Sequence, residues 1–356
     1  MALNQVGLER LNTATTKKIG MSKNLIINGA MQVAQRGTSS TTSGYSTVDR
    51  FKTVHSGTDE APTYAQVDVA SGTTPYTSGF RKALKITNGN QTSGAGAADF
   101  ISYAYRIEAQ DIANSGWNYV SSSSYITLSF WIKSSVAQDF KGYIRSHDGT
   151  SQAYAFATGS LSADTWTKIT KTIPGNSNLT FDNDNDVGFE IVLGGFWGTD
   201  YTNNSVTENV WAAYASGTRM KDNTSTWYTT NDSTIELTGL QLEVGSVATD
   251  FEHECYQKQL YRCYRYYVER GFESLLGSKS GAVGYPRVNF PVVMRAVAST
   301  VIKYDGTDGA MRNQNDGSKT TGFSTYNHYD YGFASRGSNG SPDIIYSSTY
   351  YADAEL

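Results

Sequence analysis

From residue 24 to residue 252, short stretches in which apolar and polar residues alternate are separated by clusters of Gly, Asn, Asp and Ser. In the stretch 124–134 (SYITLSFWIKS), Ile126, Leu128 and Phe130 occupy every second position, the period of a strand with one buried face. The same alternation predicts further strands over 64–69, 81–87, 102–108, 165–173, 187–193 and 235–244. Gly239 indicates a bulge in the last of these. This succession of short strands and turns predicts a jelly-roll β-sandwich over 24–252.

After residue 252 the hydrophobic period changes from two to about 3.6 residues. Thr249 and Glu252 match a capping box, in which a hydroxyl and a carboxylate satisfy free amides at the start of a helix. The residues that recur on one helical face are Tyr256, Leu260, Cys263, Tyr264 and Tyr267. Gly271 is a suitable helix end. We therefore predict a linking helix over 253–271.

Residues 272–356 return to short strand patterns, expected over 287–293, 298–304, 322–326, 330–334 and 343–346. Pro291 suits an edge strand or its entrance, because proline cannot donate a ladder hydrogen bond. This C-terminal β module is small and much of its apolar surface is tyrosine. Such a module favours packing against other copies of the chain, and we expect a homotrimer. The fold class expected is therefore all-β, with a sandwich, one helix and a small β module.

Composition supports the β assignment and limits the functional classes. Hydrophobic residues make up 38% and charged residues 17% of the 356 residues, and the net charge is −4. This balance disfavours a helical bundle and a nucleic-acid partner. No apolar run is long enough to span a bilayer, and residues 1–20 lack a signal-peptide core, so we expect synthesis in a cytoplasm without membrane insertion. Cys255 and Cys263 would lie about 12 Å apart along the predicted helix, too far for a disulfide.

Residues 1–23 form a short basic segment on an otherwise acidic chain. Its cationic residues are Arg10, Lys17, Lys18 and Lys23, against Glu9 alone, which gives a local charge of +4 − 1 = +3. A segment of this kind is typical of an attachment arm. The alternative is a frayed terminus without a function.

Four stretches carry a resemblance to a known group of proteins. They are 24–36 (NLIINGAMQVAQR), 44–51 (GYSTVDRF), 129–135 (SFWIKSS) and 239–267 (GLQLEVGSVATDFEHECYQKQLYRCYRYY), and the terminal YADAEL joins them. Together they resemble phage tail-fibre and virion structural proteins. The resemblance covers most of the chain in order, and its most specific part is 239–267. It supplies no catalytic residue.

The resemblance implies a virion component, usually oligomeric, whose body is like a carbohydrate-binding module of jelly-roll fold. We therefore expect a bacteriophage structural protein of the fibre or receptor-binding type that recognises a host-surface polysaccharide without catalysis. Residues 1–23 would attach it to other virion proteins. Two alternatives stay open. One is a capsid decoration or head-fibre protein, and the other is a polysaccharide depolymerase.

Aromatic residues in polar, loop-like sequence are the candidate glycan contacts. They are Trp197, Tyr201, Trp211, Tyr214, Trp227 and Tyr228. An aromatic ring offers a flat apolar face to a pyranose, while nearby amides and hydroxyls bind its polar edge. The alternative is that these rings fill small satellite cores beneath long loops. On the first interpretation, replacing Trp211 and Trp227 together by alanine abolishes adsorption and leaves the fold intact.

Asp182, Asp184 and Asp186 alternate in a polar loop and could hold Ca²⁺, since carboxylates are hard oxygen ligands. An EF-hand is excluded because Val187 and Leu193 occupy the sixth and twelfth positions. The alternative is a solvated turn. No other cofactor is expected. The four histidines fall far apart without metal-ligand spacing, and no nucleophile-elbow motif is present, so we expect no enzymatic activity.

Overall fold

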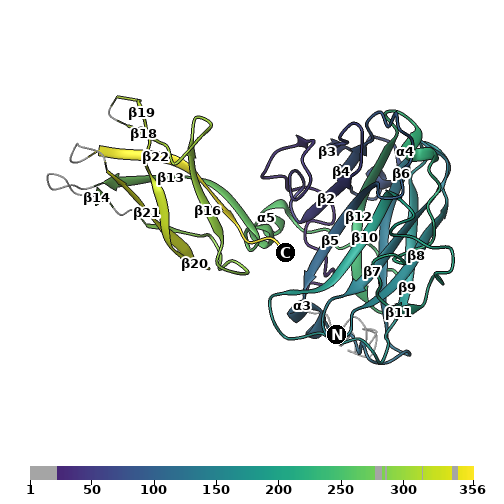
Figure 1. The fold of residues 1–356 in the computed structure, drawn as a ribbon. Helices are drawn as coiled ribbons and strands as arrows, with labels where there is room; N and C mark the ends of the chain where they lie inside the picture. The colour runs from purple at the N-terminus through teal and green to yellow at the C-terminus, as the bar shows by residue number, and fades with distance from the viewer. Residues whose placement is uncertain (1–21, 277–282, 285–286, 315, 339–343) are drawn as a thin grey trace, which may run out of the picture.

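The computed structural model describes residues 22–276, 283–284, 287–314, 316–338 and 344–356. Two β-rich parts lie on either side of the short helix α5 (Tyr256–Tyr264), as Figure 1 shows. Apart from Ser22 and Lys23, the predicted attachment segment 1–23 lies outside the described residues. Among the described residues, no helix is both long and apolar enough to cross a bilayer.

The first part is a sandwich of two antiparallel six-stranded sheets. The first sheet runs in the order β1 (Ser39–Ser40), β3 (Thr63–Asp68), β4 (Lys82–Thr87), β12 (Thr234–Val244), β6 (Tyr125–Ser134) and β9 (Thr167–Pro174). The second runs β11 (Trp211–Ala213), β8 (Gln152–Ser160), β7 (Asp139–Ser146), β10 (Val187–Trp197), β5 (Phe100–Glu108) and β2 (Phe51–Ser56). Helices α2 (Thr74–Thr77), α3 (Ala109–Ala113) and α4 (Thr226–Thr229) lie in the connections.

The alternating positions of these strands build one core between the two sheets. Ile126, Leu128 and Phe130 of β6 are at most 1% exposed, and they pack in the same cluster as side chains of the facing sheet. The predicted strands of this part are therefore confirmed, and so is the all-β jelly-roll sandwich. Gly239 has a φ of 64° at a register shift between Thr238 and Gln241, which confirms the bulge.

In this part the prediction missed strands β1, β2, β7, β8 and β11. In β8 the outward positions carry small alanines, so the alternation of large apolar and polar residues is weak there. Strand β10 is also longer than predicted. It continues beyond Gly194 and Gly195 to Trp197, with a bulge between Gly194 and Phe196, because β5 pairs with it along this whole length. At Gly195 a Cβ atom would lie 2.6 Å from the Trp227 ring, so glycine lets that ring approach.

The predicted linking helix over 253–271 is only partly right. Helix α5 has nine residues and begins after Cys255, which makes no side-chain capping hydrogen bond, and the predicted capping box does not form. Instead the Thr249 hydroxyl donates to Glu243, and the Glu252 carboxylate accepts the Asn24 amide at 2.7 Å. Both residues therefore fasten this segment to neighbouring parts of the sandwich.

The last five residues of the predicted helix, 267–271, belong to a strand. Residues 267–276 form β13 (Tyr267–Leu276), which pairs along all ten residues with β22 (Ile344–Asp353). A partner strand thus overrides the local helical spacing. Both cysteines are free, as expected, with Cys255 exposed and Cys263 buried.

The C-terminal module contains two small sheets. One has the order β17 (Thr307–Asp308), β16 (Ser299–Tyr304), β22, β18 (Met311–Asn313) and β19 (Lys319–Thr320), with β13 paired to β22. The other has the order β14 (Val283–Gly284), β21 (Gly332–Ser338) and β15 (Arg287–Asn289), with β20 (Ser324–Tyr329) paired to β21. Residue 343 of the predicted strand 343–346 lies outside the described residues.

This module has a core of its own. Its buried residues include Val268, Val288, Phe290, Met294, Ile302, Met311, Phe323, Phe333 and Tyr350. Phenylalanine, methionine and branched aliphatic residues thus form most of that core, and several tyrosines are left for the surface. Strand β15 ends at Asn289, so Pro291 follows the strand and does not interrupt it.

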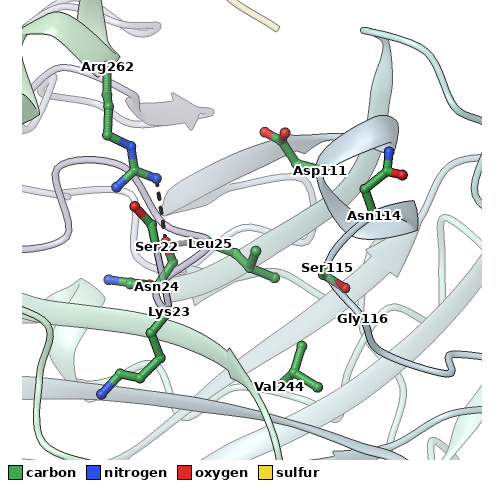
Figure 2. Close-up of a pocket in the computed structure, with 10 residues that line it drawn as sticks. All are labelled: Ser22, Lys23, Asn24, Leu25, Asp111, Asn114, Ser115, Gly116, Val244 and Arg262. Atoms are coloured by element: carbon green, nitrogen blue, oxygen red, sulfur yellow. Dashed lines mark hydrogen bonds between the residues drawn. The ribbon is translucent and has the colours of Figure 1, made fainter. Parts of the chain in front are cut away.

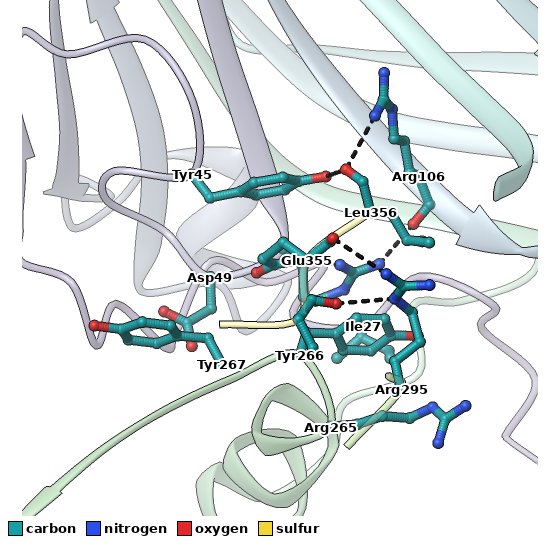
Figure 3. A network of polar contacts seen from close by, with 12 residues as sticks. Ile27, Tyr45, Asp49, Arg106, Arg265, Tyr266, Tyr267, Arg295, Glu355 and Leu356 are labelled. Atoms are coloured by element: carbon teal, nitrogen blue, oxygen red, sulfur yellow. Dashed lines mark hydrogen bonds and ion pairs between the residues drawn. The ribbon is translucent and has the colours of Figure 1, made fainter. Parts of the chain in front are cut away.

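The two parts meet at a polar joint around residues 353–356 (Figure 3). The fully buried guanidinium of Arg50 binds the Glu355 carboxylate, donates to the Arg106 carbonyl at 2.7 Å and lies 3.4 Å from the Tyr266 ring centre. The Leu356 carbonyl accepts hydrogen bonds from Tyr45 at 2.9 Å and from Arg106 at 3.0 Å. Side chains of the sandwich therefore bind the segment that follows β22.

Two further arginines close this joint. Arg265, directly after α5, binds Glu108 of β5 through two hydrogen bonds of 2.7 and 2.6 Å, and the Tyr266 hydroxyl donates to the same carboxylate at 2.6 Å. Burial alone would raise the pKa of Glu108, but these donors hold that pKa below its usual value. Arg295 donates to the carbonyls of Ala354 at 2.8 Å and Asn185 at 2.7 Å.

Candidate functional site

Two of the predicted glycan contacts lie inside the sandwich core. Trp227 and Tyr228 of α4 are 0% and 1% exposed. The Trp227 indole donates to the Thr234 carbonyl at 3.0 Å, and the Tyr228 hydroxyl donates to Asp99 at 3.0 Å. The structure contradicts a ligand-binding role for both, because α4 turns their large rings inward to fill the core at that end.

Trp197 and Tyr201 lie on the outer face of the second sheet, where residues 198–225 cover them. The Trp197 ring is 5% exposed and stacks on Phe100 at 4.5 Å, with Tyr201 edge-on at 5.2 Å. The Arg219 guanidinium lies 4.8 Å from the Trp197 ring centre. These side chains and the half-buried Tyr214 belong to a satellite cluster. The alternative interpretation is therefore correct for Trp197, which offers no open ring face.

Trp211 is half-buried on the edge strand β11. Its indole donates to the Pro174 carbonyl at 2.7 Å and its ring lies 5.3 Å from that of Tyr154. The structure thus does not gather all the predicted aromatics at one site. They divide among the main core, the satellite cluster and one sheet edge.

The predicted calcium ligands form a turn that contacts the joint. The Asp182 amide donates to Asp148, the Asp184 carboxylate accepts the Asp186 amide at 3.0 Å, and Asp186 lies 3.7 Å from Arg295. Within the part of the chain that the structure describes, no group of three His, Cys, Asp or Glu side chains is placed to hold a metal ion. The three carboxylates do not converge, which corrects the calcium prediction in favour of a solvated turn.

A cavity of about 420 Å³ lies where the described chain begins (Figure 2). Its wall is formed by the segment 22–25 on one side and by the end of α3 with residues 114–116 on the other. Arg262 donates to the Asn24 carbonyl at 3.4 Å across it. Leu25 and Val244 supply its apolar surface, and the lining contains no aromatic ring. It therefore offers no stacking surface for a sugar.

A groove of about 500 Å³ in the C-terminal module has the features that the predicted site lacks. Its floor is Gly332 and Ala334 of the central strand β21. Cross-strand pairing places Arg287 and Asn289 of β15 along one side and Tyr326 and Tyr329 of β20 along the other. We call this groove, lined by Arg287, Asn289, Tyr326, Tyr329, Tyr331, Gly332 and Ala334, the tyrosine trough.

The strand period explains why these side chains share one face. Val288 and Phe333, at the intervening positions, are 6% and 3% exposed and point into the module core. Their neighbours in sequence must then face outward, because successive side chains of a strand alternate. Since Gly332 and Ala334 are small, the middle strand leaves a depression between two rows of longer side chains. A Cβ atom at Gly332 would lie 2.3 Å from the Val288 carbonyl, which makes glycine necessary there.

The aromatic wall ends in a pair of parallel rings. The rings of Tyr329 and Tyr331 lie 5.0 Å apart at an angle of 8°, and the two residues are 48% and 54% exposed. Their turn is fixed by backbone hydrogen bonds from Met294 to the Asp330 carbonyl at 2.7 Å and from Phe290 to the Tyr331 carbonyl at 2.9 Å. The turn that carries these two exposed rings is therefore fixed to the segment 290–294 by backbone hydrogen bonds.

Sequence reasoning did not find the tyrosine trough. The signal was the stretch 326–332 (YNHYDYG), in which three tyrosines, one asparagine and one glycine fall within seven residues. We interpreted it only as short strands in a tyrosine-rich module. Which tyrosines face outward depends on the bulge between Tyr326 and Tyr329, where Asn327 has a φ of 49°. That bulge was not predicted.

No protein-family model matches the chain, and no curated protein matches it. Among solved structures, it is similar to the enzymatically active domain of tailspike protein 4 of bacteriophage CBA120, with 10% identity and a TM-score of 0.33 over 63% of this chain and 22% of that chain. It is also similar to a CBM4 structure, with 14% identity and a TM-score of 0.32 over 63% of this chain and 100% of that chain.

A third similar structure is the N-terminal cellulose-binding domain of Cellulomonas fimi β-1,4-glucanase C. The identity is 12% and the TM-score 0.28, over 61% of this chain and 99% of that chain. All three TM-scores lie below 0.5, so the assignment of the fold rests on the sheets described above. The function has to be argued from the residues of the chain itself.

Proposed function

We propose that this chain binds a carbohydrate through the tyrosine trough and does not cleave it. The observation that carries the proposal is the exposed, parallel pair Tyr329 and Tyr331 beside a wall that bears Arg287 and Asn289. A sugar ring has an apolar C–H face that can lie on a phenol ring and a polar edge that hydrogen-bonds to amide and guanidinium groups. The volume of about 500 Å³ lies within the usual range for sites that bind small ligands.

The lining also supports binding over hydrolysis. Glycoside cleavage generally uses a pair of carboxyl groups on the two sides of the scissile bond. The described residues that line the tyrosine trough include no aspartate or glutamate. A depolymerase would need such a pair at another place on the chain.

The biological setting that we propose is a bacteriophage particle, with this chain as a fibre-type protein that binds a host-surface polysaccharide. Its support is the sequence resemblance of stretches 24–36, 44–51, 129–135 and 239–267 to virion structural proteins. Residues 1–23 would then attach the protein to other virion proteins. A head fibre or capsid decoration protein would share these features, and labelling the protein on the particle distinguishes the two locations.

The variant Tyr329→Ala/Tyr331→Ala tests the site. We expect it to bind at least about tenfold more weakly to its glycan, because buried tyrosine contacts are frequent hot spots of binding. The wild-type protein is first screened against an array of bacterial surface glycans. Wild type and variant are then titrated with the polysaccharide that the wild type binds. The circular-dichroism spectrum should not change, since both side chains are about half exposed.

The matched control is Tyr256→Ala/Tyr261→Ala. These two tyrosines of α5 are 53% and 47% exposed but lie outside the tyrosine trough. The control should bind normally. Unchanged binding by the Tyr329→Ala/Tyr331→Ala variant would remove the trough from the site. New reducing ends in the same incubations would show that the protein is a depolymerase.

We also propose that the protein acts as a homotrimer. Binding by a single shallow groove is weak, and linking three copies can raise the overall avidity by roughly 10²–10⁴ without new contacts. Analytical ultracentrifugation at micromolar concentration should give three times the mass of the 38.9 kDa chain. A folded monomer under those conditions would contradict this part of the proposal.

A further inference from the structure

We propose that the tyrosine trough selects saccharides that carry an anionic group, a carboxylate or a phosphate, and that Arg287 binds that group. This inference rests on the carbohydrate binding proposed above. Arg287 is exposed at the start of β15, directly opposite Ala334 on the floor of the trough. Among the described residues that line the trough, it is the one charged side chain.

Arg287 differs from the arginines of the joint in having no protein partner among the described residues. Arg36, Arg50, Arg106 and Arg265 each form an ion pair with a carboxylate of the protein. Arg287 forms no ion pair or side-chain hydrogen bond with any described residue. Its guanidinium therefore keeps its N–H donors available for a ligand. Those donors form a planar fork that matches a carboxylate or a phosphate with two parallel hydrogen bonds.

The arrangement of the trough gives its two walls different tasks. Neighbouring strands lie about 4.8 Å apart, so the rows on β15 and β20 face each other across roughly 10 Å of backbone. A sugar ring that stacks on Tyr329 would direct the substituents of its opposite edge toward Arg287 and Asn289. Tyr329 and Asn289 can contact a neutral or a charged hexose, whereas the positive charge of Arg287 adds electrostatic attraction only for an anionic one.

Because the whole chain is acidic, attraction for an anionic sugar has to come from this local cation. The net charge is −4, so the protein as a whole does not attract a polyanion. Asp330 lies in sequence between Tyr329 and Tyr331, but it does not line the trough. Among the described residues of the groove, an anionic sugar would thus meet the positive charge of Arg287 and no carboxylate.

The test compares acidic glycans with neutral derivatives of the same chain. The unchanged protein, Arg287→Gln and Arg287→Lys are titrated with the acidic bacterial polysaccharides on the array. Each polysaccharide is also presented after carboxyl reduction, which turns a hexuronic acid into the neutral hexose, and after removal of its phosphates. We expect Arg287→Gln to weaken binding to the acidic form by about 10- to 100-fold, the usual effect of a charge-assisted hydrogen-bonded pair. Binding to the neutral form should change less than about twofold.

Arg287→Lys should recover only part of the loss, since lysine keeps the charge but not the fork. Arg312→Gln, on the exposed side of β18 in the same module, is the matched control and should bind normally. The derivative whose binding falls identifies the anion as carboxylate or phosphate. Equal binding of acidic and neutral forms, with Tyr329→Ala/Tyr331→Ala still impaired, would overturn this inference and leave the carbohydrate site standing. An unimpaired tyrosine variant, or no glycan bound at all, would overturn both.

Discussion

Trp227→Ala is expected to lower the free energy of unfolding by about 3–5 kcal/mol, the usual cost of truncating a fully buried aromatic side chain. Trp227 is 0% exposed and its ring packs edge-on against Phe140 at 6.4 Å. The substitution leaves a cavity and also removes the indole donor from the Thr234 carbonyl. Urea titration followed by circular dichroism measures the effect as a lower midpoint of unfolding. This replaces the expectation that Trp227 could be removed without harm to the fold.

Trp166→Ala is the matched control, because it deletes the same side chain from a half-buried position. Trp166 packs against a peripheral cluster around Phe80 and lies outside the main core. We expect less than half of the loss seen for Trp227→Ala. If the two variants unfold at the same urea concentration, the burial described for Trp227 is wrong.

Breaking the buried ion pair of the joint should cost a similar amount. Arg50→Met leaves the Glu355 carboxylate, itself 4% exposed, without its main partner, and removing one member of a buried pair usually costs about 3–5 kcal/mol. Glu355→Gln should be destabilising for the converse reason. The double variant Arg50→Met/Glu355→Gln should lose much less than the sum of the two, since no buried charge then remains without its partner. Urea unfolding of the four proteins completes the cycle.

The control for that cycle is an exposed pair in the same module. Lys319 and Asp305 lie 3.0 Å apart, but their side chains are 37% and 71% exposed. Lys319→Met should therefore cost less than about 1 kcal/mol. Small-angle scattering of Glu355→Gln adds a second reading, because a weakened joint lets the two parts separate. Strictly additive losses, or a loss no larger than that of Lys319→Met, would show that the pair does not hold the joint.

The sandwich could be predicted from the sequence because its strands carry a local signal. In β6 and β12, large apolar side chains alternate with polar ones, and pairing with neighbouring strands only confirms what the pattern indicates. Strand β13 had no such signal. Residues 256–267 have helical spacing throughout, and only the partner β22, far along the chain, turns Tyr267 into a strand residue. Local sequence patterns do not predict a pairing between strands so far apart in the chain.

The candidate site could not be predicted for a related reason. A tryptophan in polar sequence can cover a core as readily as it can face solvent, and Trp197 and Trp227 are enclosed by segments that no local pattern identifies. The exposed rings of the tyrosine trough are Tyr329 and Tyr331, and their orientation depends on a bulge and a fixed turn. Residue type indicated the chemistry of the site but not its place.

The stretches that carry the family resemblance have a structural meaning. The backbone amide of Asn28, in the stretch 24–36, donates to the Gln259 side-chain oxygen of α5 at 2.6 Å. Gln35 donates to the Tyr267 carbonyl at 2.9 Å, and Arg50 binds Glu355. Segments far apart in sequence thus meet where the two parts join. Residues of the resembling stretches therefore hold the C-terminal module against the sandwich. The trough lies outside these stretches.

The binding of residues 354–356 by the sandwich has a consequence for biosynthesis. Residues 24–252 contain both sheets of the sandwich, so they can fold while the rest of the chain is still being translated. Glu355 and Leu356, however, must leave the ribosome before Arg50, Tyr45 and Arg106 acquire their partners. Until then Arg50 of the nascent polypeptide lacks the Glu355 carboxylate that neutralises it in the folded protein. The joint is therefore completed only after residues 354–356 have been synthesised.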